Sequence, residues 1–147
     1  MVPDRVTHLF FYGVLLGDVA PPAVKALLAD LGPGRKGTVQ GMLYAVPDPE
    51  GSYPVLIKGT ARVHGMVHEA RGVDMAALDL FEGIDPHDPA NSEYRRIVME
   101  AVLEDGSTMM SQAYFYNREI GDHLVPLEHG DFTRYLLETG FRPYSGE

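Results

Sequence analysis

Strand-like segments run through the middle of the chain and limit the folds open to it. GTVQGMLYAV (37–46) alternates loosely between apolar and polar residues, and the turn PDPEG (47–51) separates it from SYPVLIKG (52–59). TARVHGMVHEA (60–70) follows as a third strand. Short runs bounded by turns rich in glycine and proline are typical of neighbouring strands. Gly65, inside the third run, indicates a bulge or the close approach of another backbone segment.

Two other regions also predict strands. THLFFYG (7–13) is an apolar run closed by a glycine, while YRRIVMEAVLEDG (94–106) and MMSQAYFYN (109–117) flank a short polar turn. The latter arrangement predicts a β-hairpin. With the three central segments, these runs give six expected strands in a mainly antiparallel sheet.

Helical periodicity predicts three short helices. In APPAVKALLADLG (20–32), apolar residues recur at i, i+3, i+4 and i+7 after two prolines that can only open a helix. A second helix is expected at about 74–82, with Asp74 as its N-cap and Gly83 just past its end. A third is expected over 131–140. The pattern predicts an α+β fold in a single domain over residues 1–147, with the sheet closed or strongly curled.

Composition narrows the possible functions. The chain has 12 Lys and Arg against 21 Asp and Glu, and its net charge of -9 argues against nucleic acid or an anionic membrane as a partner. It has no cysteine, which excludes disulfides, thiolate metal sites and cysteine nucleophiles. The first residues lack the basic and apolar regions of a signal peptide. We therefore expect a cytoplasmic protein that needs no metal and no other cofactor.

The segment LDLFEG (78–83) places an acid in an unusual position. Glu82 lies in the last turn of the helix expected over 74–82, where the helix dipole disfavours a carboxylate by roughly 0.3–1 kcal/mol. On a helical wheel Glu82 borders the apolar face, and Asp79 lies one turn behind it. Partial burial, the helix end and the second carboxylate would each raise the pKa of Glu82 above about 4.3, towards the range useful for proton transfer. An exposed acid without a function is the alternative interpretation.

The stretch FFYGVLLGD (10–18) ends a strand and then turns at a glycine. Backbone N–H groups exposed at such a turn can bind a carbonyl oxygen or an oxyanion. An ordinary junction between a strand and a turn explains the same residues. Tyrosines also gather near the expected strand ends, either for packing or as the walls of a small polar pocket: Tyr12, Tyr44, Tyr53, Tyr114 and Tyr116.

Two pairs of side chains bear on other kinds of site. His64 and His68 lie on one face of a strand, roughly 13 Å apart, which is too far for them to share a metal. Arg95 and Arg96 are adjacent on a strand, so only one of them can face a given side. Either arginine could bind a substrate carboxylate or remain solvated.

The order of these motifs resembles that of the gamma-glutamylcyclotransferase-like family. The matching segments are YGVL (12–15), YPVLI (53–57), LDLFEG (78–83), YRRIVMEAVL (94–103) and AYFY (113–116). EHGDFTRYL (128–136) is similar to the start of the family's last helix. The resemblance covers about residues 8–136 and implies a small mixed, mainly antiparallel β-barrel with about three short helices.

The resemblance also implies intramolecular acyl transfer on a small-molecule γ-glutamyl substrate. The free α-amine of the substrate attacks its γ-carbonyl and releases 5-oxoproline together with an amine or an amino acid. The family's general acid and base falls on Glu82, and its glutamyl-binding turn falls on Tyr12, Gly13, Val14 and Leu15. Val14 stands where Thr or Ser is common, which keeps a backbone N–H group but removes a hydroxyl.

Two other functions are compatible with the same residues. A non-catalytic module of this fold could bind γ-glutamyl metabolites, and an acyl transferase to a second amine would need an acceptor site that the sequence does not reveal. The leaving group is not specified by the motifs. The loop IDPHDPANSE (84–93) is acidic, and if it lines the leaving-group side, a cationic amine would suit it.

Overall fold

The structure is a computed structural model that describes residues 8–12, 26, 29, 31–70 and 72–142. Within this part of the chain the strands are β1 (His8–Phe11), β2 (Gly34–Val46), β3 (Tyr53–Glu69), β4 (Tyr94–Leu103), β5 (Thr108–Tyr116) and β6 (Val125–Leu127). The α-helices are α2 (Met75–Phe81) and α3 (Phe132–Thr139), and Pro89–Asn91 form one turn of 3₁₀-helix. No helix in these ranges is long and apolar enough to span a membrane.

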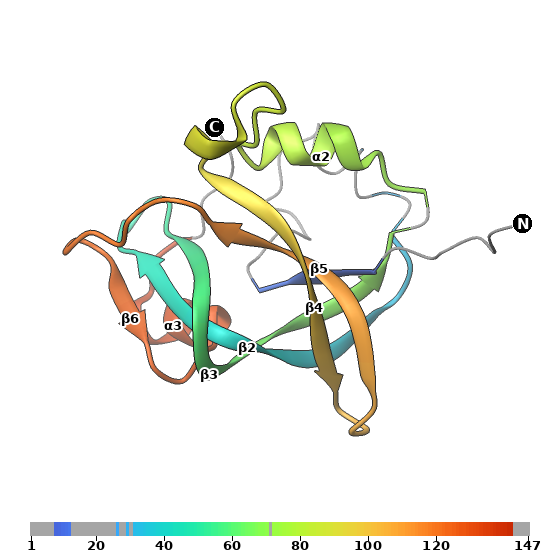
Figure 1. Ribbon diagram of the computed structural model, residues 1–147. Coiled ribbons are helices and arrows are strands. Elements are labelled where there is room, and N and C mark those ends of the chain that lie inside the picture. The colour runs from blue at the N-terminus through green and yellow to red at the C-terminus, as the bar shows by residue number, and fades with distance from the viewer. Residues whose placement is uncertain (1–7, 13–25, 27–28, 30, 71, 143–147) are drawn as a thin grey trace, which may run out of the picture.

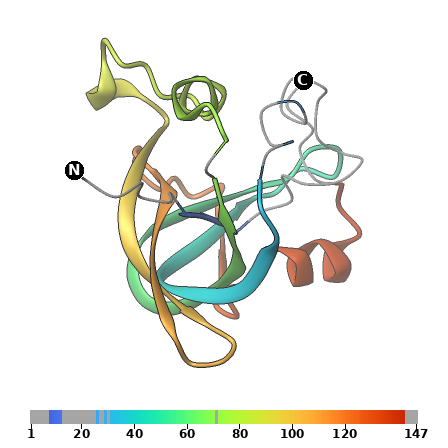
Figure 2. The ribbon, with the colours of Figure 1, turned by 90° about the vertical axis from the view of Figure 1, so that its right-hand side faces the viewer.

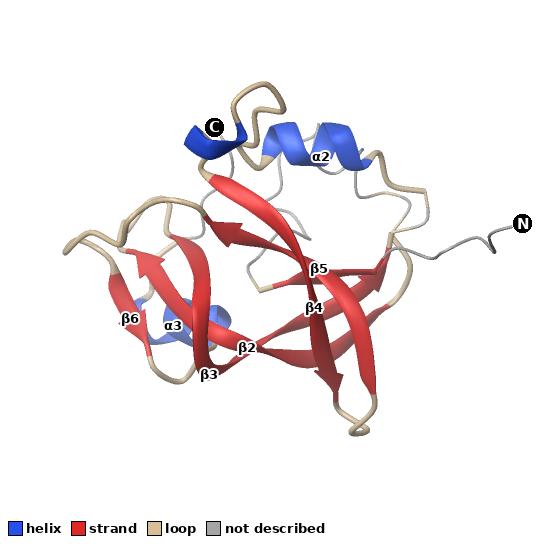
Figure 3. Ribbon diagram, viewed as in Figure 1, coloured by secondary structure: helices blue, strands red, loops and turns tan. Residues whose placement is uncertain are grey.

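The strands close into a barrel, as Figures 1 and 3 show. The order in the sheet is β3-β1-β5-β4-β2-β6, and β2 also pairs with β3. Five strands therefore form a closed ring, and β6 pairs with β2 outside it. β1 runs parallel to β5, whereas the other pairs are antiparallel. The predicted α+β class with a mixed, mainly antiparallel barrel is confirmed.

β2 and β3 form one long, bent ribbon. Their pairing runs from Gly34 opposite His68 to Gly41 opposite Ala61, then resumes at Met42 opposite Ile57, which leaves residues 58–60 without partners on β2. The prediction of two separate strands, 52–59 and 60–70, is therefore wrong. Both halves belong to β3, because a bulge bends the strand without ending its pairing.

Alternate residues of the barrel strands face two separate cores, as the two-residue period of a strand requires. Phe10 and Phe115 belong to one core, which also contains Phe132 from α3. Leu9 belongs to the other, which contains the fully buried Leu78 from α2. Figure 2 shows the two helices on different sides of the barrel. Each helix thus covers its own apolar cluster.

The boundaries of α2 follow the predicted caps. The Asp74 side chain accepts a hydrogen bond from the Ala77 N–H group at the start of α2, and Gly83 follows its end with a φ of 80°. α3 begins after Asp131 and ends at Gly140, which has a φ of 73°. The helix predicted over 20–32 lies largely outside the described residues.

The two C-terminal hairpin strands agree with their prediction, whereas β6 was not predicted. β4 and β5 pair along their length, and the Leu103 N–H group closes the turn on the Ser107 carbonyl oxygen at 2.8 Å. β6 has only three residues. So short a segment carries no two-residue alternation, and only its pairing with β2 makes it a strand.

Gly65 lies where β1 packs against β3. A Cβ atom at this position would clash with the Phe11 carbonyl oxygen and would lie 2.6 Å from Cζ of Phe10. The pairing of β2 with β3 shifts elsewhere, between Gly41 and Met42. Of the two explanations that the sequence allowed for Gly65, a close backbone approach is the correct one.

We expect Gly65→Ala to lower the free energy of unfolding by at least about 2 kcal/mol, because β1 or β3 must move to make room. Gly106→Ala is the control, since Gly106 has a φ of 86° but a Cβ atom there would meet no other atom within 4 Å. The control should lose only about 1 kcal/mol through backbone strain. Urea unfolding measures both, and equal losses would contradict the steric explanation.

Candidate active site

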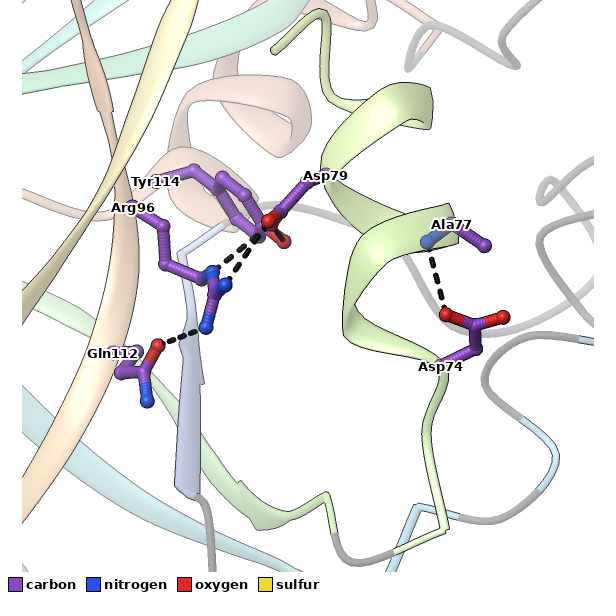
Figure 4. Close-up of polar contacts among 6 residues, drawn as sticks. All are labelled: Asp74, Ala77, Asp79, Arg96, Gln112 and Tyr114. Atoms are coloured by element: carbon purple, nitrogen blue, oxygen red, sulfur yellow. Dashed lines mark hydrogen bonds and ion pairs between the residues drawn. The ribbon is translucent and has the colours of Figure 1, made fainter. Parts of the chain in front are cut away.

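Helix α2 is attached to the barrel through the carboxylate of Asp79 (Figure 4). Arg96 donates two hydrogen bonds to it, from Nε to Oδ1 at 2.9 Å and from Nη2 to Oδ2 at 3.0 Å. The Tyr114 hydroxyl donates a third, to Oδ1 at 2.6 Å. Arg96 also donates to the side-chain oxygen of Gln112. Because these partners come from β4 and β5, they fix both the position and the rotation of the helix.

The two adjacent arginines point to different sides, as the sequence predicted. Arg96 is half-buried and its guanidinium is occupied by Asp79, while Arg95 is exposed. A guanidinium that already makes a bidentate pair has little capacity left for a substrate carboxylate. Arg96 therefore serves the attachment of α2.

Glu82 is the C-cap residue of α2, one helical turn beyond Asp79. Its side chain is half-buried, and no hydrogen bond links its carboxylate to another side chain in the described part of the molecule. Burial raises the pKa of Glu82 from 4.5 to about 7, with further contributions from the negative charges of Glu93 and Asp79. The predicted burial, the neighbouring Asp79 and the direction of the shift all agree with the structure. Glu93 was not foreseen.

Several tyrosine hydroxyls interact electrostatically with this carboxyl. Tyr12 donates a hydrogen bond to the backbone oxygen of Tyr114, and Tyr94 donates one to the Pro54 oxygen at 3.3 Å. Burial raises the pKa of Tyr12, and the charge of Glu82 raises it further, so the two groups are neighbours in the fold. Burial also raises the pKa of Tyr94. These phenols stay protonated at neutral pH, and because each gives its one O–H to a backbone carbonyl, its oxygen can accept a hydrogen bond.

The structure brings together some of the predicted site residues. Glu82 and Tyr12 lie close to each other, although 70 residues separate them in the sequence. Gly13, Val14 and Leu15 lie outside the described residues. Tyr114, which the sequence placed among the tyrosines at strand ends, contacts Asp79 directly.

Two residues of the site were not predicted from the sequence. Tyr94 is the first residue of the YRR segment, and its position in that motif was the only available signal. Glu93 precedes it and belongs to the loop noted for its acidity. Nothing in its local sequence indicates that its carboxylate lies near Glu82, because that proximity depends on how the loop returns to the end of α2.

The arrangement is suited to proton transfer. A carboxyl with a pKa of about 7 is divided between its two protonation states at neutral pH, so it can both accept and donate a proton. The nearby phenols can orient a polar ligand. No group of three or more His, Cys, Asp or Glu side chains within the described ranges could hold a metal ion.

We expect Arg96→Met to lower the free energy of unfolding by roughly 2–3 kcal/mol, because it leaves the half-buried Asp79 without its cation. Arg95→Met is the matched control at an exposed position on the same strand, and should change stability by less than about 0.5 kcal/mol. Urea unfolding at pH 7 compares the two variants. Equal effects would mean that the ion pair does not hold α2 in place.

The raised pKa of Glu82 predicts a stability that falls with pH. The folded protein retains this proton up to about pH 7, whereas the unfolded chain releases it near pH 4.5, so stability is lost between these values. Glu82→Gln cannot ionise and should be more stable than the wild type at pH 8 by up to about 3 kcal/mol. The difference should shrink towards pH 4.5. Urea unfolding at pH 5 and pH 8 measures it, and a pH-independent difference would contradict the shift.

Solved structures share the fold. An Arabidopsis thaliana protein in solution has a TM-score of 0.62 at 22% identity, with 95% of this chain and 88% of that chain covered. An AIG2-like protein from Mus musculus has a TM-score of 0.61 at 20% identity, with 87% and 88% covered. A protein named gamma-glutamyl cyclotransferase has a TM-score of 0.63 at 13% identity, with 95% and 89% covered. No curated protein gives a significant sequence match.

A protein-family comparison covers most of the chain. The model for "Gamma-glutamyl cyclotransferase, AIG2-like" matches residues 9–134. This range begins in β1 and reaches into α3, so it includes the ring of strands, α2 and the site around Glu82. The chain belongs to the gamma-glutamyl cyclotransferase, AIG2-like family.

Proposed function

We propose that the chain is a cyclotransferase that converts a γ-glutamyl amine or γ-glutamyl amino acid into 5-oxoproline and the free amine. The observation that supports this most is the half-buried Glu82 carboxyl, with a pKa of about 7, next to the Tyr12 hydroxyl. A group that transfers protons in both directions works best when its pKa lies near the working pH. Membership of a family named for this reaction gives independent support.

In the proposed reaction the substrate supplies both the nucleophile and the electrophile. Ionised Glu82 removes a proton from the α-ammonium group, and the resulting amine attacks the γ-carbonyl carbon to form the new C–N bond. The ring nitrogen then still carries one proton more than the product lactam, and it releases that proton to solvent as the tetrahedral intermediate collapses with loss of the original γ-amide C–N bond. Protonated Glu82 then transfers its proton to the leaving nitrogen, which restores the carboxylate. No water is consumed.

This chemistry asks little of the protein beyond positioning and proton transfer. Ring closure is intramolecular, and well-oriented intramolecular reactions reach effective molarities of about 10⁵–10⁸ M. The glutamyl chain must be held in a bent conformation, because only then does its α-amine reach the γ-carbonyl carbon. We assign that task to the segment Tyr12, Gly13, Val14 and Leu15, where backbone N–H groups would bind the carbonyl oxygen as it becomes negative.

The test is to incubate the purified protein with a panel of γ-glutamyl amino acids and γ-glutamylamines and to follow 5-oxoproline by mass spectrometry. We expect Glu82→Gln to lower the rate by at least about 100-fold, because it removes the group that transfers the proton. Glu104→Gln is the matched control, since Glu104 directly follows β4 and is exposed. It should turn over like the wild type.

The same panel distinguishes a cyclotransferase from a non-catalytic binding module. Ligands that raise the melting temperature while no 5-oxoproline forms in the wild type would indicate a binding module for γ-glutamyl metabolites. Equal rates in Glu82→Gln and the wild type would show that Glu82 is not the proton-transfer group. The member of the panel that reacts fastest would identify the leaving amine.

A further inference from the structure

The loop that follows α2 returns to the end of that helix and places a second carboxylate there. The Glu93 N–H group donates a hydrogen bond to the Gly83 carbonyl oxygen at 3.2 Å. The Glu93 carbonyl oxygen accepts one from the Asn117 N–H group at 2.8 Å. The backbone of Glu93 is therefore held on both sides, by the residue next to Glu82 and by the residue after β5.

Two side chains hold the rest of the loop in place: Asn117, which follows β5, and Ser92 within the loop itself. The Asn117 amide donates to the Pro89 and Ser92 carbonyl oxygens, each at 3.1 Å. The buried Ser92 hydroxyl accepts a hydrogen bond from the Asp85 N–H group at 2.8 Å and donates to the Asp88 carbonyl oxygen at 3.1 Å. These bonds cross the loop from end to end, so the loop cannot easily carry Glu93 away from α2.

The side chain of Glu93 lies over Gly83. A Cβ atom on Gly83 would be 3.3 Å from Cβ of Glu93 and 3.5 Å from its Oε1 atom. Within the described part of the chain Glu93 pairs with Arg118, whose Nη1 lies 3.9 Å from Oε2 and whose side chain is 55% exposed. An exposed ion pair at that distance offsets little of the carboxylate's charge. Glu93 thus brings a largely uncompensated negative charge beside Glu82.

The other titratable groups around Glu82 carry little uncompensated charge. Asp79 on α2 shares its charge with Arg96 on β4 and accepts a hydrogen bond from Tyr114 on β5. In the ranges that the structure describes, Tyr12 after β1 and Tyr94 on β4 also interact with Glu82. Phenols are neutral at neutral pH. Among the described neighbours, Glu93 is therefore the group that most directly opposes ionisation of Glu82.

We propose that Glu93 is a positioning residue that acts through Glu82: held over Gly83, its carboxylate keeps the Glu82 carboxyl protonated to a higher pH than burial alone would. Besides burial, the negative charges of Glu93 and Asp79 raise the pKa of Glu82. The electrostatic part of this inference does not depend on the proposed function. Its consequence for turnover does, since it assumes that Glu82 is the base.

The direct test is a ¹³C NMR titration of the Glu82 carboxyl in protein labelled at glutamate, with the signal assigned by its absence in Glu82→Gln. The wild type should titrate near pH 7. Glu93→Gln keeps the backbone hydrogen bonds and removes the charge, so the midpoint should fall by roughly 0.5–1 unit. Glu104→Gln removes one charge at the hairpin turn and should leave the midpoint unchanged.

A second variant keeps the test decisive if Glu93→Gln does not fold. Glu93→Ala removes the carboxylate while the backbone hydrogen bonds of residue 93 remain, and it should likewise lower the Glu82 midpoint. An unchanged or higher midpoint in Glu93→Gln overturns the inference. If that variant cannot be studied, an unchanged or higher midpoint in Glu93→Ala overturns it.

The pH dependence of kcat/KM gives the matching functional readout. When ionised Glu82 is the base, kcat/KM rises with pH through the Glu82 pKa. The rising limb of the kcat/KM profile should move to lower pH in Glu93→Gln. When each profile is divided by its own plateau value, this variant should be roughly two- to fivefold faster than the wild type at pH 6. If no protein in the series forms 5-oxoproline, the proposed function fails, while the NMR titration still decides the role of Glu93.

Discussion

The site depends on one partly buried ion pair, between Asp79 on α2 and Arg96 on β4. The bidentate geometry and the additional hydrogen bond from Tyr114 fix the helix on the barrel. Glu82 lies one turn further along the same helix, so its position is set by the same contact. A short helix of seven residues has little intrinsic stability and needs such tertiary contacts to persist. Leu78, the fully buried residue before Asp79, adds the apolar part of the attachment.

Two carboxylates on adjacent turns of this helix have opposite environments. Asp79 makes a bidentate ion pair with a guanidinium and accepts a hydrogen bond from a phenol. Glu82 is half-buried and lies near another carboxylate. Both conditions destabilise its charged form and raise its pKa to about 7. Separating the environments of neighbouring acids is how proteins give them different roles. The same feature makes the folded state less stable as the pH rises from about 4.5 to about 7.

Local sequence predicted much of the fold because its signals are local. Asp74 and Gly83 defined α2 through capping and a left-handed glycine, and the polar turn between β4 and β5 defined their hairpin. The break placed between 59 and 60 was wrong, since a bulge and a strand end have the same glycine signature. The sequence of β6 shows no alternation of apolar and polar residues that would predict a strand. Its hydrogen bonds to β2 come from a segment some 80 residues away.

The sequence by itself determined the strand and helix periods, the acid at the end of α2 and the motifs of the family. It also indicated that Glu82 would be half-buried with a raised pKa, because burial and helix position follow from the wheel. Only the tertiary structure decided which arginine neutralises Asp79, that Tyr12 lies beside Glu82, and that Glu93 lies over Gly83. These facts concern charges brought together by barrel closure and by loop hydrogen bonds. Electrostatic interactions depend on distance in space, which the spacing of residues along the chain does not specify.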